Sequence, residues 1–229
     1  MSIHQVIAKL CDRLREVPRS LRMSRIFLLS PAHSGGVRAG LLTRPEAAFE
    51  LALRVRAGKA NVGEVFSFCS GLYFRGKLAY ARHFAQAPKG ITGVQVITTS
   101  RGLVPADMEL GMDELREFAA VPVDINEPRF TAPLEQSVRE LARQFEGEIV
   151  LLGSIATGKY VDCLLPILGQ RLLFPEEFIG RGDMSRGGLM LRCAAQGEQL
   201  HYIPVEGAVR RGRRATKISQ MPVKRAAPE

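Results

Sequence analysis

The sequence predicts an α/β fold, with a mostly parallel sheet, helices on both faces and an antiparallel hairpin at its C-terminal edge. Short apolar runs typical of buried strands alternate with longer segments whose apolar residues recur at helical spacing. Strands that alternate with helices in this way form parallel β-α-β units. Near the C-terminus, two apolar runs lie on either side of a short polar turn, which is typical of a hairpin.

The first half of the chain begins with an amphipathic segment at 3–16 that Pro18 ends, so we expect residues 1–22 to form an N-terminal helical extension. A single α/β domain is then expected over 23–208. Its first elements are predicted to be, in order, a strand at 25–30, a helix at 44–58, a strand at 63–68 and a helix at 76–85.

The second half continues the alternation. The same patterns predict a strand at 93–99, helices at 112–120 and 133–145, a strand at 148–153, a helix at 158–168, and a closing hairpin formed by 188–194 and 199–205.

The charge of the chain is concentrated at its C-terminal end. The formal net charge is +9, and residues 210–229 carry seven basic residues and one acidic residue, a net +6 that leaves +3 for residues 1–209. This segment, 209–229, is predicted to be a disordered basic tail. Its charge favours a polyanionic partner such as nucleic acid, although a solvated tail that only aids solubility has the same composition.

Other bulk features exclude several classes of protein. No apolar run approaches the roughly 20 residues of a membrane helix, and no signal-peptide core is present, so we expect a cytoplasmic protein without a membrane partner. The four cysteines are scattered and form no cluster with metal-ligand spacing. The sequence therefore predicts no metal and no cofactor, and it specifies no oligomeric state.

A glycine-lysine pair follows the predicted strand at 148–153. Gly153 and Gly158-Lys159 have the G-x-x-x-x-G-K spacing of a phosphate-binding loop, but Tyr160 stands where that loop needs a hydroxyl ligand for magnesium. We therefore do not predict nucleotide hydrolysis. Backbone amides here, with Ser154 and Lys159, are candidates for an anion site, and a tight strand-to-helix turn is the alternative.

Two further polar clusters follow predicted strands. Tyr73 is a candidate to stack on a base while Arg75 and Lys77 bind phosphate, although the same residues also suit a helix anchored by its aromatic side chains. Ser100 and Arg101 end the next predicted strand and are candidate phosphate ligands.

The densest polar cluster is the glycine-rich stretch at 178–189. Asp183 lies between Arg181 and Arg186, with Ser185 beside them. A carboxylate between two arginines stays ionised, so Asp183 is a candidate catalytic residue, and the neighbouring side chains are candidates to bind phosphate. An Arg-Asp ion pair that braces an irregular loop is the alternative.

The order of "LLSPA", "SGLYFRGKLAYA", "RGLVPADMEL" and "VLLGSIATGKYVDCLL" resembles that of YaaA-like peroxide-stress proteins and related bacterial α/β domains over about residues 24–170. The resemblance implies an α/β domain with a positively charged cleft and an association with DNA or oxidative DNA damage. The stretch "GRGDMSRGG" does not belong to the shared pattern, so the resemblance implies nothing about Asp183.

These observations favour a DNA-acting, base-processing enzyme that cleaves an N-glycosidic bond, as a DNA glycosylase does. Asp183 would position water or stabilise an oxocarbenium-like sugar, and the basic side chains would hold the backbone. Two alternatives remain: a stress-response protein that binds nucleic acid without catalysis, and an enzyme acting on free nucleosides or nucleotides.

Overall fold

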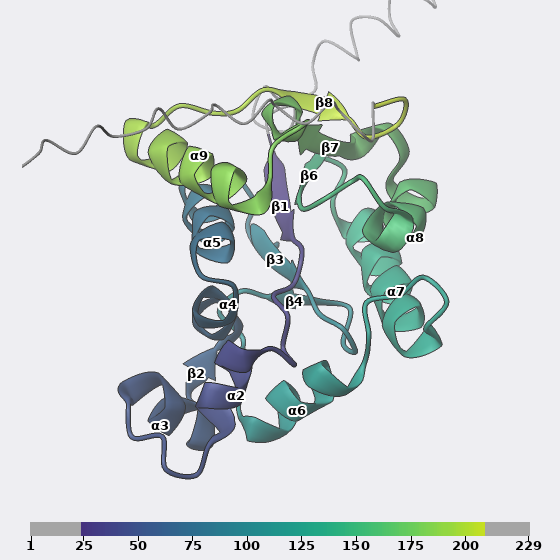
Figure 1. The fold of residues 1–229 in the computed structure, drawn as a ribbon. Coiled ribbons are helices and arrows are strands. Elements are labelled where there is room, and N and C mark those ends of the chain that lie inside the picture. Colours follow the sequence, from purple (N-terminus) through teal and green to yellow (C-terminus); the bar gives the residue numbers. More distant parts are fainter. Residues whose placement is uncertain (1–23, 209–229) are drawn as a thin grey trace, which may run out of the picture.

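The computed structural model describes residues 24–208 (Figure 1). The predicted N-terminal extension at 1–22 and basic tail at 209–229 lie outside the described residues. The main sheet has six strands in the order β4-β3-β1-β6-β7-β8, namely β4 (Leu103–Pro105), β3 (Val94–Ile97), β1 (Arg25–Leu29), β6 (Glu148–Leu152), β7 (Leu172–Pro175) and β8 (Tyr202–Pro204).

The four central strands are parallel, and each edge strand is antiparallel to its neighbour. The fold class is therefore as predicted, including the antiparallel pair β7-β8 at the C-terminal edge. A separate two-stranded sheet joins β2 (Ala60–Asn61) to β5 (Glu109–Leu110). The central strand β1 is buried from Ile26 to Leu29, because helices cover both of its faces.

Two groups of helices flank the sheet. Figure 1 shows α5 and α9 on one side and α7 and α8 on the other. The helices of the described region are α2 (Val37–Thr43), α3 (Glu50–Arg56), α4 (Val62–Ser70), α5 (Leu72–Phe84), α6 (Met112–Ala120), α7 (Pro128–Gln144), α8 (Gly158–Leu168) and α9 (Asp183–Gln196), with short 3-10 turns at Gly169–Arg171 and Glu176–Phe178.

The strand predicted at 63–68 is wrong: this segment belongs to helix α4. The Asn61 side chain accepts a hydrogen bond from the Glu64 backbone N–H, and the Glu64 carboxylate accepts one from the Asn61 N–H. This capping box starts a helix and outweighs the strand-like composition that follows it.

The strand predicted at 188–194 is also wrong, because these residues lie in α9. The buried positions of that helix are Gly187, Met190 and Cys193. Their spacing of about three residues places them on one helical face. The first strand of the C-terminal antiparallel pair is instead β7, a short run that ends at Pro175.

The helix predicted at 44–58 is shorter, since α3 spans only Glu50–Arg56. The helices predicted at 112–120 and 158–168 have the expected bounds. None of the described helices is both long and apolar enough to cross a membrane.

Candidate functional site

The order in which the chain adds strands to the sheet reverses at the carboxyl ends of β1 and β6. From β1 the chain continues to β3 on one side, and it later returns to β6 on the other side of β1. Ligands of open α/β sheets bind in the crevice outside the strands at such a point. Ser30 follows β1 here, and Gly153 follows β6. A Cβ atom on Gly153 would lie 3.0 Å from the Ser30 Cβ, so the two strand ends lie in contact.

A buried lysine extends from α5 to this point. Lys77 is 1% exposed, and its Nζ donates hydrogen bonds to the Ser30 carbonyl oxygen at 2.6 Å and to Ser30 Oγ at 2.9 Å. Nζ also lies 4.5 Å from the centre of the Tyr73 ring and 4.8 Å from that of Phe74. Burial lowers the pKa of Lys77 to about 7, and the nearby Asp183 carboxylate opposes this shift.

Two glycines let α9 approach α5 closely enough to complete the site. A Cβ atom on Gly76 would lie 2.5 Å from the Gly187 carbonyl oxygen, and one on Gly187 would lie 2.7 Å from the Leu72 carbonyl oxygen. The two backbones therefore pack without side chains between them. This contact places the first turn of α9, with Asp183 and Arg186, beside Tyr73 and Lys77.

Asp183 and Arg186 have different environments in this turn. The Asp183 side chain is 67% exposed, whereas that of Arg186 is 12% exposed. The two groups form a loose ion pair of 3.7 Å, and the Arg186 guanidinium donates to the Phe178 carbonyl oxygen at 2.9 Å and 3.2 Å. Arg186 is therefore fixed by the backbone, while the Asp183 carboxylate remains available to a ligand.

Two tyrosines complete the group. Burial raises the pKa of Tyr73 to about 12, with Arg186 opposing the shift. Burial also raises the pKa of Tyr160, and the nearby Tyr73 and Asp183 add to this rise. Both tyrosines are therefore neutral hydroxyls at physiological pH. We call Ser30, Tyr73, Lys77, Tyr160, Asp183 and Arg186 the lysine cluster.

A cleft of about 570 Å³ adjoins the lysine cluster at Tyr160. Its polar wall includes His33, Ser34, Thr99 and Lys159, and its apolar wall is formed by residues 118–123 and Ala32. The Ser34 hydroxyl is buried and has no hydrogen-bond partner in the described part of the chain. A buried polar atom without a partner is a candidate ligand contact. The volume is within the range of small-molecule sites.

The loop between β6 and α8 has the glycine-lysine spacing of a phosphate-binding loop, but its structure is less suited to binding phosphate. Ser154 Oγ accepts a hydrogen bond from the Ala156 N–H at 3.3 Å, so this side chain is used within the loop. A Cβ atom on Gly158 would overlap the Asp162 carboxylate, so a negative charge already lies beside the start of α8. Lys159 lines the cleft. An acidic group in this position disfavours a bound phosphate.

The structure brings together four of the predicted site residues, Tyr73, Lys77, Asp183 and Arg186, and places Lys159 in the adjoining cleft. The remaining ones lie elsewhere or have local partners. Ser100 and Arg101 both bind Glu117 of α6, Arg181 contacts Ser185 at 3.4 Å, and Arg75 lies in a separate pocket.

The sequence did not identify Tyr160 as a site residue. Tyr160 was notable only because it stands where a phosphate-binding loop needs a small hydroxyl residue to bind magnesium. The signal that was present is its position in the first turn of α8, after a strand that ends at the crevice. The burial of Lys77 had no signal in the sequence, because it depends on how α5 packs against β1 and α9.

Within residues 24–208, no three or more histidine, cysteine, aspartate or glutamate side chains gather so as to hold a metal ion. No family model, curated protein or solved structure matches this chain. The resemblance to YaaA-like proteins therefore stays a prediction, and the functional argument depends on the geometry of the lysine cluster and its cleft.

Proposed function

We propose that this protein is a DNA-acting enzyme that cleaves the N-glycosidic bond of a nucleotide, with Asp183 and Lys77 at its reacting centre. The observation that carries the proposal is the buried Lys77 amine at the point where the chain changes direction across the sheet. Its lowered pKa of about 7 lets it exchange a proton near neutral pH, which is the property required of a general acid.

N-glycosidic cleavage needs two groups that this site offers. The sugar develops positive charge as the base leaves, and a carboxylate stabilises that charge or activates the attacking water. Asp183 suits this role because its carboxylate is 67% exposed and held only by a 3.7 Å contact to Arg186. The leaving base carries away the electron pair of the broken bond and must gain a proton.

Lys77 and Ser30 suit the delivery of that proton. The Lys77 Nζ donates a hydrogen bond to Ser30 Oγ at 2.9 Å. Ser30 Oγ in turn donates to the Leu152 carbonyl oxygen over a long distance of 3.4 Å, so its proton is weakly held. The hydroxyl can therefore pass its proton to the base and regain one from the lysine. Water adds its hydroxide to the sugar carbon, and its remaining proton goes to Asp183.

The cleft gives the base a place to bind outside the duplex. Its volume of about 570 Å³ suits one nucleobase with its sugar, and Phe118 and Tyr160 contribute aromatic surface. A base inside a duplex cannot reach such a pocket, so it must first rotate out of the stack. The serine that precedes the cleft-lining residues 31–35 is Ser30, which links the cleft to the lysine cluster.

The same volume also suits a free nucleoside, which makes a nucleoside hydrolase the second candidate. The chemistry at Asp183 and Lys77 would be unchanged. The two candidates differ only in whether a polymer is required, so the substrates in one assay can separate them.

The test is base release from a panel of single-stranded and duplex DNAs that carry normal and damaged bases, alongside free nucleosides. Released base is measured by mass spectrometry, and abasic sites are measured by strand breakage in hot alkali. We expect release from one DNA substrate, with loss of activity in Asp183→Asn and Lys77→Met. Lys59→Met, which removes an exposed lysine on the chain segment before β2, is the matched control and should keep full activity. Equal activity in Lys77→Met and the wild type would overturn the proposal.

A further inference from the structure

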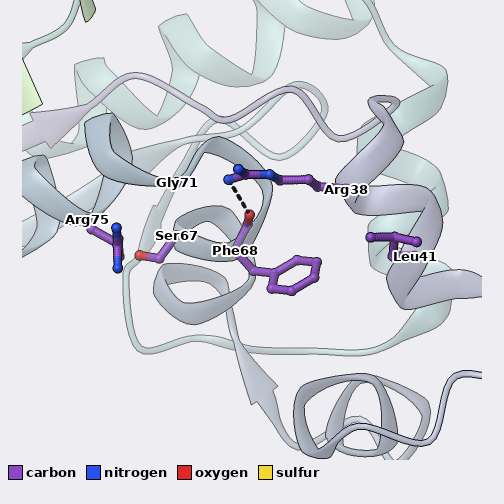
Figure 2. A pocket seen from close by; sticks show the side chains of 6 residues that line it. All are labelled: Arg38, Leu41, Ser67, Phe68, Gly71 and Arg75. Carbon is purple, nitrogen blue, oxygen red and sulfur yellow. Dashed lines mark hydrogen bonds between the residues drawn. The ribbon is translucent and has the colours of Figure 1, made fainter. Parts of the chain in front are cut away.

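A second pocket lies among α2, α4 and the start of α5. Its volume is about 500 Å³, and it is lined by Arg38, Leu41, Ser67, Phe68, Gly71 and Arg75. Figure 2 shows the Ser67 hydroxyl directed toward Arg75, while Arg38 reaches across from α2 toward the Phe68 carbonyl oxygen. We propose that this pocket, called here the arginine pocket, binds the phosphate group of a nucleotide.

The two arginines of the pocket have no carboxylate partner among residues 24–208. The Arg75 side chain forms no hydrogen bond or ion pair in that range, and the Arg38 side chain forms a single long hydrogen bond there, of 3.5 Å, to the Phe68 carbonyl oxygen. Neighbouring arginines are paired: Arg54 with Glu64, and Arg82 with Asp107. No acidic residue lines the pocket, so its positive charge is left for a ligand.

A buried hydroxyl between the arginines also lacks a partner. Ser67 Oγ is shielded from solvent and forms no hydrogen bond within the described residues. Such an atom is costly unless a ligand or water binds it. The hydroxyl is directed toward the Arg75 side chain, so the two groups lie together in the lining of the pocket (Figure 2).

Gly71 permits the arrangement. Its φ is +63°, a conformation that side chains rarely adopt, and a Cβ atom there would lie 2.5 Å from a terminal nitrogen of Arg38. Only a glycine at the junction of α4 and α5 lets the Arg38 guanidinium pass over the backbone. The pocket is therefore shaped by the backbone as well as by its charged side chains.

These donors fit a phosphate better than a carboxylate. Arg38, Ser67 and Arg75 come from three helices and approach one volume from different directions. The tetrahedral oxygens of a phosphate can accept from all three, whereas a planar carboxylate offers two oxygens in one plane. Phe68 and Leu41 add apolar surface, which suits the sugar or base next to the phosphate.

The arginine pocket lies close to the cleft along the chain. Residues 31–35 line the cleft, and Arg38 and Leu41 of the same segment line the pocket. On α5, Arg75 and Lys77 are two positions apart and so lie on nearly opposite faces of the helix. The inference depends on the proposed function only in identifying the phosphate as part of DNA; the binding itself requires no cleavage.

The test compares the full-length wild type with Arg38→Met, Arg75→Met and Ser67→Ala. Calorimetry measures binding of inorganic phosphate, thymidine and thymidine monophosphate, and fluorescence anisotropy measures binding of a short labelled oligothymidylate at several salt concentrations. Arg44→Met is the matched control, because Arg44 is exposed at the end of α2 and lies outside both pockets.

We expect each pocket arginine variant to weaken binding of the monophosphate or the oligonucleotide about tenfold, and Arg44→Met to leave it nearly unchanged. The slope of the logarithm of the oligonucleotide binding constant against the logarithm of the salt concentration should fall in magnitude by about one for each arginine variant. Binding of the monophosphate but not thymidine assigns the pocket to a terminal phosphate, and binding of the oligonucleotide alone assigns it to the strand backbone.

The inference is overturned if Arg38→Met and Arg75→Met bind like the wild type, if Arg44→Met weakens binding equally, or if no phosphate compound binds. Its failure is distinguishable from failure of the proposed function. Base release together with unchanged phosphate binding in the arginine variants would refute only the proposal for the arginine pocket. Arginine-dependent binding without base release would refute only the proposed enzymatic activity.

Discussion

Replacing Lys77 with methionine should change how the stability of the protein depends on pH. The pKa of Lys77 is about 7 in the folded chain against a reference value of 10.5. Between these two values the unfolded chain holds a proton that the folded chain lacks. The free energy of unfolding of the wild type therefore rises with pH in this window, by at most about 1.4 kcal/mol per pH unit.

Summed over the window, protonation of the buried amine costs the folded state about 5 kcal/mol below pH 7. Methionine has a similar length and no charge, so Lys77→Met removes this cost together with the hydrogen bonds to Ser30. We expect the variant to be the more stable protein at about pH 7. Its advantage should shrink by about 2 kcal/mol between about pH 7 and pH 9, because the lysine of the folded wild type loses its proton over this range while that of the unfolded chain keeps it.

The assay is urea denaturation followed by circular dichroism at a series of pH values between these limits. The free energy of unfolding of Lys59→Met, which removes an exposed lysine, should depend on pH as that of the wild type does. A constant difference between the wild type and Lys77→Met across the series would refute the reasoning, because it would mean that Lys77 keeps an ordinary pKa.

Further predictions concern packing, capping and catalysis. Gly187→Ala should destabilise the protein by about 2–3 kcal/mol in urea denaturation, because its Cβ would lie 2.7 Å from the Leu72 carbonyl oxygen. Gly188→Ala is the control: its Cβ would meet only the end of the Arg192 side chain, so the change should be neutral or stabilising by up to about 1 kcal/mol. Equal losses in both would contradict the close packing of α5 and α9. Asn61→Ala should lower the free energy of unfolding by about 1 kcal/mol through loss of the α4 cap, and an unchanged value would show that the cap is dispensable. Asp183→Asn should lower the rate of base release by about a hundredfold or more with the thermal unfolding temperature retained, and a rate near that of the wild type would remove Asp183 from the reaction.

The sequence predicts three of the four parallel strands, because β1 and β6 each contain four consecutive buried apolar residues and β3 is apolar at three of its four positions. It does not predict the fourth, β7. It fails where a local signal and composition disagree. The segment 62–70 has the apolar content of a strand, but the capping box at Asn61 and Glu64 starts a helix there. For α9, the glycine-rich stretch at 178–189 has the composition of a loop, whereas Gly187 is the position at which α9 packs against α5.

The candidate site was predictable only in part, for a related reason. Asp183 and Arg186 are recognisable in the sequence as a polar cluster with glycines around it. Their proximity to Lys77 depends on the contact between α5 and α9, which joins residues more than a hundred positions apart. Likewise, Arg75 and Lys77 look equivalent in the sequence, yet one is exposed in the arginine pocket and the other is buried against Ser30.

The measurement that tests the central claim most directly is the rate of base release as a function of pH, for the wild type, Lys77→Met and Lys59→Met on the same DNA. The proton donor must carry its proton, so we expect the wild-type rate to fall as pH rises above about 7, the pKa of Lys77. Lys59→Met should follow the wild type, and Lys77→Met should be slow at every pH. A Lys77→Met rate that matches the wild type, or the absence of base release from every DNA and nucleoside tested, would contradict the account.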